Sequence, residues 1–303
     1  MDKYKGGGRM NLRDLPEEEY FTSGHTACPG CAAPIIVRHM MKILGKDTVV
    51  YTPANCLLVF GGTYPYIAWK VPYFHEAFEN TGAAISGAAR AFRKKGKNTT
   101  VIGFAGDGGT YDIGIQALSG AAERNEDVIY VCYDNEAYMN TGIQRSGSTP
   151  YGADTTTTPP GRKIKGKLEH KKDMAEIMRA HEVPYVATLS IAHIADFLKK
   201  VEKAKKIKGF RYLHVLSPCP TGWRFDPSKT VEVARKAVDS GMWTLYEAEY
   251  GEITNIYKPK KKIPVAEYIK GQGRFRHFTP EMIEELQRWV DRKWERLYGE
   301  KPE

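Results

Sequence analysis

The stretch VIGFAGDGGTYDIGIQALSGAAERNEDVIYVCYDNEAYMNTGIQ, residues 101–144, has the pattern of a strand, a glycine-rich turn, a helix, a strand and a loop. In the turn, Gly106, Gly108 and Gly109 let the backbone bend tightly and let a ligand approach it closely. The helix that we expect from about Asp112 offers free N–H groups and the positive end of its dipole to an anion. A glycine-rich turn alone is also typical of an ordinary connection between a strand and a helix.

Asp107 lies inside this turn, where a bare phosphate would repel it. A carboxylate beside a phosphate is favourable when a divalent cation lies between them, and Mg²⁺ prefers hard oxygen ligands. Asn135, separated from the Gly-Asp-Gly motif by 26 residues, can add an amide oxygen if the two strands are neighbours. A nicotinamide site fits less well because it requires G-x-G-x-x-G, although Asp134 could mimic its ribose-binding carboxylate.

Strand-like and helix-like segments alternate on both sides of this stretch. The strand-like segments are short and apolar on both faces, as buried parallel strands are: 47–52, 99–105, 127–134, 185–190 and 210–217. The helical patterns are 33–44, 78–95, 112–125, 173–182, 192–205 and 228–240. This alternation predicts an α/β fold, with a parallel sheet and helices on both of its faces.

In such sheets, ligands bind at the carboxyl ends of the strands. Three loops follow strand ends, at 106–111, 135–170 and 218–227. The 135–170 loop is long and rich in Gly, Thr and Pro, which is typical of a functional loop. We therefore expect the site of this protein to be built from these loops.

The pattern changes after Trp243. Residues 243–257 have the pattern of a hairpin or meander, and 278–299 that of a terminal helix with Thr279 as N-cap and Pro280 in its first turn. We expect an N-terminal lead-in at 1–19, a main domain at 20–243, and a small C-terminal extension at 244–303.

The cysteines are few and unevenly placed. Cys28 and Cys31 form a C-x-x-C pair, a spacing shared by redox dithiols, zinc half-sites and iron–sulfur half-sites. Cys56 and Cys219 each follow a strand and should lie at the same edge as the glycine-rich turn, whereas Cys132 lies within a strand and is expected to be a core thiol. Four converging thiols can hold zinc or a [4Fe–4S] cluster, and one pair plus two distant cysteines favours the cluster.

Composition narrows the class of protein. No apolar run of the 303 residues approaches the ~20 that a membrane helix needs, and residues 1–20 lack the apolar core of a secretory signal. We therefore predict a cytoplasmic protein with reduced thiols and no membrane contact. The net charge of +9 is typical of solvated basic faces or of an acidic partner, and no nucleic-acid-binding motif supports nucleic acid as that partner. The basic runs are 93–97, 162–172, 199–208 and 258–262.

The Gly-Asp-Gly and Asn spacing resembles the thiamine diphosphate signature of thiamine-dependent enzymes. Over roughly residues 20–245, the chain resembles the β subunit of the 2-oxoacid:ferredoxin oxidoreductases, closest to the pyruvate and branched-chain members. The motifs that carry the resemblance are TSGHTACPGC (22–31), PANC (53–56), FENTGAA (78–84), GDGGTYDIGIQALSGAAERN (106–125), YDNEAYMNTGIQRSGSTP (133–150) and CPTGW (219–223). The resemblance implies a thiamine diphosphate fold and an enzyme that cleaves a 2-oxoacid with coenzyme A. Its products would be CO₂, an acyl-CoA and two electrons for ferredoxin, and the reaction is reversible.

The resemblance also implies roles for single residues. One [4Fe–4S] cluster beside the thiamine would be held by Cys28, Cys31, Cys56 and Cys219. Mg²⁺ would be held by Asp107, Asn135 and the carbonyl of Ala137. Thiamine diphosphate would be bound by Cys56, Gly106, Asp107, Gly108, Gly109, Asn135, Glu136, Ala137, Tyr138, Met139 and Asn140. Asn140 would be catalytic, because an amide can hydrogen-bond an oxyanion or carboxylate without adding charge.

Two positions depart from the family pattern. Ala32 replaces a glycine, and Ala33 stands where single-chain members carry a glutamate that contacts the cofactor, so we expect no such contact here. The glutamate that activates thiamine belongs, in this family, to a partner α subunit or domain. The resemblance therefore implies half of an active site, completed by an α subunit and accompanied by γ/δ-type subunits.

Several alternatives stay open from the sequence. The substrate could be pyruvate, 2-oxoisovalerate, an aryl 2-oxoacid or oxalate. The chain could also be a non-redox thiamine-dependent lyase with structural zinc, or a zinc-stabilised basic binding module. Glu79, Glu136, His25 and His75 are expected to have surface, loop or packing roles.

Overall fold

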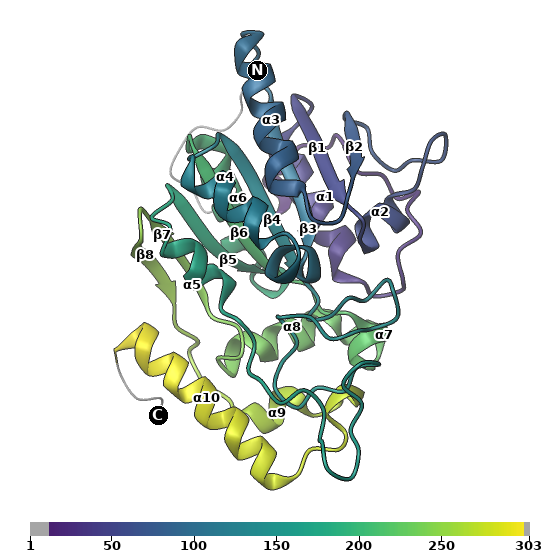
Figure 1. Cartoon of the computed structure of the whole chain (residues 1–303), viewed down its shortest axis with the longest axis vertical. Helices are drawn as coiled ribbons and strands as arrows, with labels where there is room; N and C mark the ends of the chain where they lie inside the picture. The colour runs from purple at the N-terminus through teal and green to yellow at the C-terminus, as the bar shows by residue number, and fades with distance from the viewer. Residues whose placement is uncertain (1–11, 300–303) are drawn as a thin grey trace.

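The computed structural model describes residues 12–299, and most of them pack around one sheet (Figure 1). Its strand order is β2-β1-β3-β4-β6-β5-β7-β8. Strands β1 to β6 run parallel to one another, while β7 and β8 are antiparallel at one edge. The strands are β1 (Thr48–Pro53), β2 (Tyr73–Glu76), β3 (Thr100–Gly106), β4 (Val128–Asp134), β5 (Tyr185–Ser190), β6 (Phe210–Leu216), β7 (Leu245–Glu249) and β8 (Glu252–Tyr257). The predicted α/β fold is confirmed.

The α-helices connect these strands and continue into the C-terminal segment. They are α1 (Ala32–Leu44), α2 (Cys56–Gly61), α3 (Thr81–Lys94), α4 (Ile115–Glu123), α5 (Met174–Arg179), α6 (Ile194–Lys206), α7 (Pro220–Trp223), α8 (Thr230–Asp239), α9 (Val265–Ile269) and α10 (Pro280–Tyr298). Short turns of other helix types are η1 (Leu12–Asp14), η2 (Gly108–Asp112), η3 (Ile191–His193), η4 (Pro227–Lys229) and η5 (Gly273–Phe275).

Two hydrophobic cores lie on opposite faces of the sheet. On one face, α1 and α6 pack over alternate residues of β3 and β4 such as Ile102 and Val131. On the other face, α3, α4 and α5 pack over the intervening residues, including Tyr130 and Cys132. Every residue of β4 and β6 is buried, which explains why these segments are apolar on both faces. Helices on both faces are therefore confirmed, as is the buried position of Cys132.

A third core joins the C-terminal segment to the main sheet. It includes Trp223 of α7 and Val238 of α8 as well as Tyr268 of α9 and Val290 of α10. The terminal helix begins as predicted, since Thr279 accepts a hydrogen bond from the N–H of Met282 and Pro280 follows it. The core spans both sides of position 243/244, so the segment 244–303, as far as the structure describes it, packs on the main domain.

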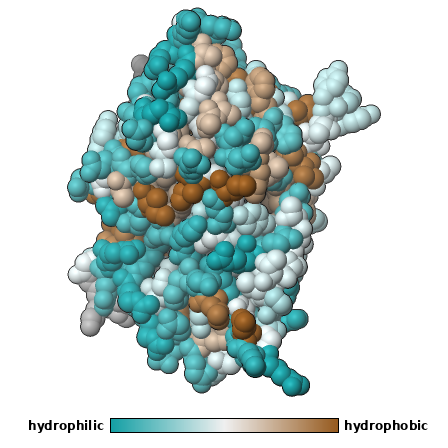
Figure 2. All heavy atoms as spheres, in the orientation of Figure 1, coloured by the Kyte–Doolittle hydropathy of each residue, from teal (hydrophilic) through white to brown (hydrophobic). Residues whose placement is uncertain are grey.

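The surface is polar over much of the view in Figure 2. Hydrophilic residues cover the upper end of this view, over the end of α3, whose last turn begins the basic run 93–97. No helix within residues 12–299 is long and apolar enough to cross a membrane. Of the lead-in predicted at 1–19, residues 1–11 lie outside the described part of the chain.

The edge strand β2 was missed by the sequence reading, because its residues YFHE are half-buried or exposed and form no apolar run. It pairs with β1 and ends at Glu76, opposite Pro53. Both carboxylate oxygens of Glu76 are buried without a hydrogen bond of good geometry. Burial raises the pKa of Glu76 to about 7, and the hydroxyl of Thr81 offsets this only in part.

Replacing Glu76 with Gln is therefore expected to stabilise the protein at pH 8 and to change little at pH 4. The unfolded chain releases the proton of Glu76 near pH 4.5 and the folded chain only near pH 7, so folding stability falls between these values and stays reduced above them. After discounting for solvent screening, we expect a gain of about 1–2 kcal/mol at pH 8. Urea unfolding at both pH values measures it, with the exposed Glu79→Gln as control. An equal gain at pH 4 would show that ionisation of Glu76 is not the cause.

Candidate cofactor and metal site

The glycine-rich turn and the loop after β4 meet at the carboxyl edge of the sheet. Strands β3 and β4 are parallel neighbours, with Gly106 opposite Tyr133, so Asp107 and Asn135 follow adjacent strand ends. Both side chains are buried. The arrangement confirms the expected adjacency of the two strand ends.

Three polar atoms converge between these strand ends. One terminal atom of the Asn135 amide lies 3.0 Å from Asp107 Oδ1 and 2.7 Å from the carbonyl oxygen of Ala137. If that atom is the amide oxygen, its distances to the other two oxygens are close to the ~3.0 Å between neighbouring ligands of an octahedral Mg²⁺ with Mg–O bonds of ~2.1 Å. If it is the nitrogen, it donates to both neighbours in the metal-free protein. The residues present therefore fit a magnesium ion.

The surroundings of Asp107 disfavour the negative charge of its carboxylate, and a bound cation would offset this effect. Burial, followed by the nearby carboxylate of Asp134, raises the pKa of Asp107 well above its ordinary value. The hydroxyl of Ser146 donates a short hydrogen bond to Asp107 Oδ2, which offsets the shift only in part. A bound divalent cation would stabilise the ionised form directly.

Among the glycines of the turn, packing requires Gly108 most clearly. A Cβ atom on Gly108 would overlap the ring of Tyr138, whose hydroxyl donates to Asp112 Oδ2 at 2.9 Å. A Cβ on Gly106 would meet only ordinary contacts, and neither residue has a positive φ. After the turn, the chain forms the π-helical turn η2 before α4 begins at Ile115. The helix that was predicted to begin at about Asp112 therefore begins at Ile115, after this wider π-helical turn.

Asp134 lies beneath this site and is fully buried. It accepts hydrogen bonds from Tyr111 at 2.9 Å, from Ser148 at 2.6 and 2.7 Å, and pairs with His214 Nε2 at 2.9 Å. Burial alone would raise the pKa of Asp134, but Lys171, His214 and Ser148 outweigh it and hold the pKa below its ordinary value. Because its oxygens are already occupied, Asp134 is not available to a ribose, which removes the support for a nicotinamide site.

Four of the five cysteines surround a second hollow beside the first site. Its volume is about 110 Å³, and Cys28, Cys31, Cys56 and Cys219 line it together with Asn135 and Asn140. A single Zn²⁺ with Zn–S bonds of ~2.3 Å would hold four sulfurs ~3.8 Å apart. Within residues 12–299, however, no three His, Cys, Asp or Glu side chains are placed to hold one metal ion. A single zinc ion and a [4Fe–4S] cluster both stay open as the occupant of this hollow.

Three thiols of this hollow, those of Cys31, Cys56 and Cys219, have raised pKa values and so favour the protonated form. Burial is the main cause that raises the pKa of Cys31 and of Cys56 to about 12, and the neighbouring cysteines add to it. Burial also raises the pKa of Cys219. Metal ions bind thiolates, so loading this site must release protons.

Local backbone turns place these cysteines around the hollow. Gly30, between Cys28 and Cys31, has a φ of 71°, and a Cβ there would overlap the backbone of Pro227. Cys56 starts α2, where Asn55 caps the helix by accepting from the N–H of Leu58 at 3.0 Å. These turns explain why C-P-G-C and P-A-N-C suit the two positions.

Cys219 lies in a loop that packs against the 135–140 loop. It is the N-cap of α7, and its Sγ accepts a hydrogen bond from the N–H of Gly222 at 3.3 Å. The side chain of Met139 packs so closely on Gly222 that a Cβ there would overlap its sulfur. The 135–140 loop and the Cys219 loop are therefore in contact.

The structure brings predicted site residues together at the strand ends: Asp107, Asn135 and Ala137 converge, and Asn135 and Asn140 line the hollow of the four cysteines. Tyr138 and Gln144 close the 135–140 loop through two backbone hydrogen bonds, of 2.9 and 3.2 Å. The side chain of Glu136 points away from Asp107 and pairs with Lys171 and Arg274. Contacts of these residues with a cofactor stay predictions.

Other residues of the site were missed by sequence reasoning. Ser146, Ser148 and Thr149 bind Asp107, Asp134 and the backbone of Glu136, and only the unusual length of the 135–170 loop signalled them. Lys171 and Arg274 carried no signal in the sequence. The two histidines considered earlier are peripheral: His25 stacks on Phe21 with ring centroids 5.5 Å apart, and His75 is exposed.

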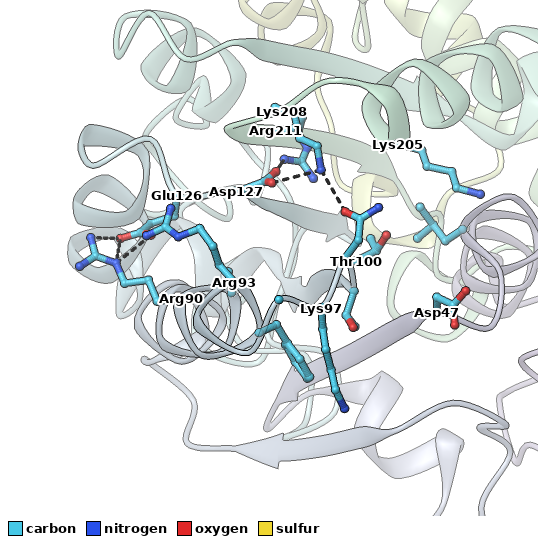
Figure 3. Close-up of a pocket in the computed structure, with 16 residues that line it drawn as sticks. Asp47, Arg90, Arg93, Lys97, Thr100, Glu126, Asp127, Lys205, Lys208 and Arg211 are labelled. Carbon is cyan, nitrogen blue, oxygen red and sulfur yellow. Dashed lines mark hydrogen bonds and ion pairs between the residues drawn. The ribbon is translucent and has the colours of Figure 1, made fainter.

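A larger hollow, of about 530 Å³, lies at the opposite edge of the sheet, beside the ends of α3 and α6 (Figure 3). It gathers parts of the basic runs 93–97 and 199–208. Two of its three acids are paired, Glu126 with Arg90 at 2.7 Å and Asp127 with Arg211. Cations at these helix ends balance the negative ends of the helix dipoles. An acidic partner at this face stays a prediction.

Comparison with known proteins identifies the fold and the family. Residues 58–215 match the family model described as thiamine pyrophosphate enzyme, C-terminal TPP binding domain. The chain is 54% identical over 278 residues to the pyruvate synthase subunit PorB of Methanothermobacter marburgensis, covering 91% of this chain and 96% of that protein. It is 50% identical over 291 residues to the ketoisovalerate oxidoreductase subunit VorB of Pyrococcus furiosus, covering 93% and 94%.

A solved structure agrees with this at the level of the fold. The 2-oxoglutarate:ferredoxin oxidoreductase of Magnetococcus marinus superposes with a TM-score of 0.56 at 19% identity, over 90% of this chain and 97% of that one. The chain therefore belongs to the family of the PorB and VorB subunits of 2-oxoacid oxidoreductases, and its central part is a thiamine pyrophosphate-binding domain.

Proposed function

We propose that this chain is the subunit of a 2-oxoacid:ferredoxin oxidoreductase that carries thiamine diphosphate, Mg²⁺ and one [4Fe–4S] cluster, with pyruvate as its substrate. The observation that carries the proposal is that the Asp107–Asn135–Ala137 site adjoins a hollow lined by four cysteines. Asn135 belongs to both, since its amide meets Asp107 and Ala137 and it also lines the hollow. Relatives named pyruvate synthase subunit PorB, at 49–54% identity, support the substrate.

In this proposal, Asp107, Asn135 and the Ala137 carbonyl hold Mg²⁺ against the diphosphate. Cys28, Cys31, Cys56 and Cys219 hold the cluster, and the pattern of one C-x-x-C pair plus two distant cysteines favours it over zinc. Thiamine diphosphate supplies a carbanion centre for cleaving 2-oxoacids, and an iron–sulfur cluster accepts electrons singly. Cys56 and Asn140 line the cysteine hollow together with Asn135, where the amide of Asn140 can donate to an oxyanion or carboxylate of the substrate.

The site needs a partner. The two glutamates considered for thiamine activation are unsuited to it: Glu136 is held by Lys171 and Arg274, and Glu79 is exposed. We infer that an α subunit supplies the activating glutamate, that γ/δ-type subunits complete a cytoplasmic complex, and that ferredoxin accepts the electrons. The relatives are named as subunits, which supports a complex of several chains.

The test is coenzyme A-dependent reduction of ferredoxin by the anaerobically purified complex on a panel of 2-oxoacids. We expect the highest kcat/KM with pyruvate and no turnover by the isolated chain. The VorB relatives, at 48–50% identity, make 2-oxoisovalerate the second candidate. Reduction with none of the 2-oxoacids, or robust turnover by this chain alone, would refute the proposal.

A further inference from the structure

Glu136 occupies an unusual backbone position between two predicted magnesium ligands. Its φ is 65°, the left-handed region that residues other than glycine rarely adopt. Asn135 precedes it and Ala137 follows it, and both must face Asp107 to complete the set of three oxygens. Such a turn persists only where surrounding contacts hold it.

Every polar group of Glu136 contacts a partner in the surrounding protein. Its N–H donates to Asp134 Oδ1 at 3.0 Å, and its carbonyl accepts from the Thr149 hydroxyl at 2.7 Å. Its carboxylate lies between two cations, with Lys171 Nζ 2.9 Å from Oε1 and Arg274 Nη1 2.7 Å from Oε2. The Arg274 contact is an ion pair without hydrogen-bond alignment.

This triad of Glu136, Lys171 and Arg274 is withdrawn from water. The side chains are 3%, 6% and 3% exposed, respectively. Burying an ion triad is often no more stabilising than an apolar contact of the same volume, so its advantage is more often a defined geometry. Here the geometry that it defines is that of the loop carrying Asn135 and Ala137.

Arg274 is itself fixed by the C-terminal segment. Its guanidinium lies 3.7 Å from the ring centre of Trp223, and it donates to Gln272 Oε1 at 3.0 Å and to the Tyr268 hydroxyl at 3.1 Å. The same Trp223 donates from Nε1 to the carbonyl of Asn135 at 2.8 Å. The C-terminal segment thus contacts Glu136 directly through Arg274, and reaches Asn135 only through the stacking of Arg274 on Trp223 of α7.

We propose that Arg274, with Lys171, is a positioning residue that presets the Asn135–Ala137 turn for Mg²⁺ through the carboxylate of Glu136. The C-terminal segment is then part of the cofactor site, although none of its residues touches the metal. This inference rests on the magnesium site proposed above. It adds that residues outside the site set the geometry of its ligands, which neither the family match nor the names of the relatives state. Outer contacts of this kind commonly change metal affinity 10–100-fold.

The experiment measures Mg²⁺-dependent binding of thiamine diphosphate to the full chain in its purified complex, by titration calorimetry, for wild type, Arg274→Met, Arg274→Lys and Glu136→Gln. Arg276→Met is the matched control, because Arg276 is exposed two residues further on. We expect about a 10-fold or greater rise in the Mg²⁺ concentration needed for half-saturation with Arg274→Met and Glu136→Gln. Arg274→Lys should restore part of the affinity, and Arg276→Met should match wild type.

The thermal midpoint of each complex without Mg²⁺ separates positioning from general destabilisation. We expect the loss of Mg²⁺ affinity in Glu136→Gln, which keeps the side-chain shape, to exceed anything that its change in midpoint explains. Wild-type Mg²⁺ affinity in Glu136→Gln and Arg274→Met would overturn the inference and leave the proposed function intact. Wild-type protein that binds no thiamine diphosphate with Mg²⁺ would overturn the proposed function and this inference with it.

Discussion

Replacing Asp107 with Ala is expected to abolish Mg²⁺-dependent retention of thiamine diphosphate. Asp107 supplies the only carboxylate among the three converging oxygens, and its buried carboxyl lies 3.0 Å from the Asn135 amide. Without it, the cation loses its one charged protein ligand, and the remaining amide and carbonyl oxygens cannot offset the charge of the diphosphate. We expect a loss of affinity of at least about 100-fold, beyond the range typical of outer contacts.

The measurement is thiamine diphosphate content after gel filtration with and without Mg²⁺, together with calorimetric titration. Asp107→Asn keeps the size of the side chain and should also fail, which separates charge from shape. Asp47→Ala, at the exposed opposite edge of the sheet, serves as control. Undiminished retention in Asp107→Ala would remove Asp107 from the magnesium site.

Replacing Cys219 with Ser is expected to strip the chain of most of its iron, whereas Cys132→Ser is expected to retain it. Cys219 lines the hollow with the other three candidate ligands, and its loss leaves a cluster with three thiolates. Cys132 is 0% exposed in the core between the sheet and α4, and so can affect packing but cannot reach that hollow. The hydroxyl that Cys132→Ser places in the core should lower the free energy of unfolding by roughly 1 kcal/mol, because it is buried.

Iron and acid-labile sulfide are measured on anaerobically purified variants, with visible absorption as a second readout. Because both variants replace a sulfur by an oxygen, the comparison holds the chemistry of the substitution constant. Loss of iron in Cys132→Ser, with Cys219→Ser unaffected, would mean that the four-ligand set is wrongly chosen.

Much of the fold was predictable because the buried parallel strands have strong patterns. The predicted strand at 185–190 matches β5 residue for residue, and the others differ by at most one residue at each end. Short elements were not predictable: α2 and α7 span six and four residues, and their positions depend on the caps Asn55 and Cys219. Strand β2 was hidden by its exposed, polar sequence.

The candidate site was predictable as far as strand ends identify it. Asp107, Asn135, Cys56 and Cys219 each follow a strand, and parallel strands bring their carboxyl ends to one edge. The surroundings were not predictable, because they depend on contacts between distant segments. Glu136 is the clearest case, since its cationic partners come from the far end of a long loop and from the C-terminal segment.

This account centres on one inorganic cluster held by four cysteines next to a magnesium-bound thiamine site. Metal analysis of the anaerobically purified wild-type chain within its complex tests that claim most directly. We predict about four iron and about four sulfide per chain, without stoichiometric zinc, and a matching content of thiamine diphosphate. One zinc per chain without iron at the Cys28, Cys31, Cys56 and Cys219 hollow would contradict it.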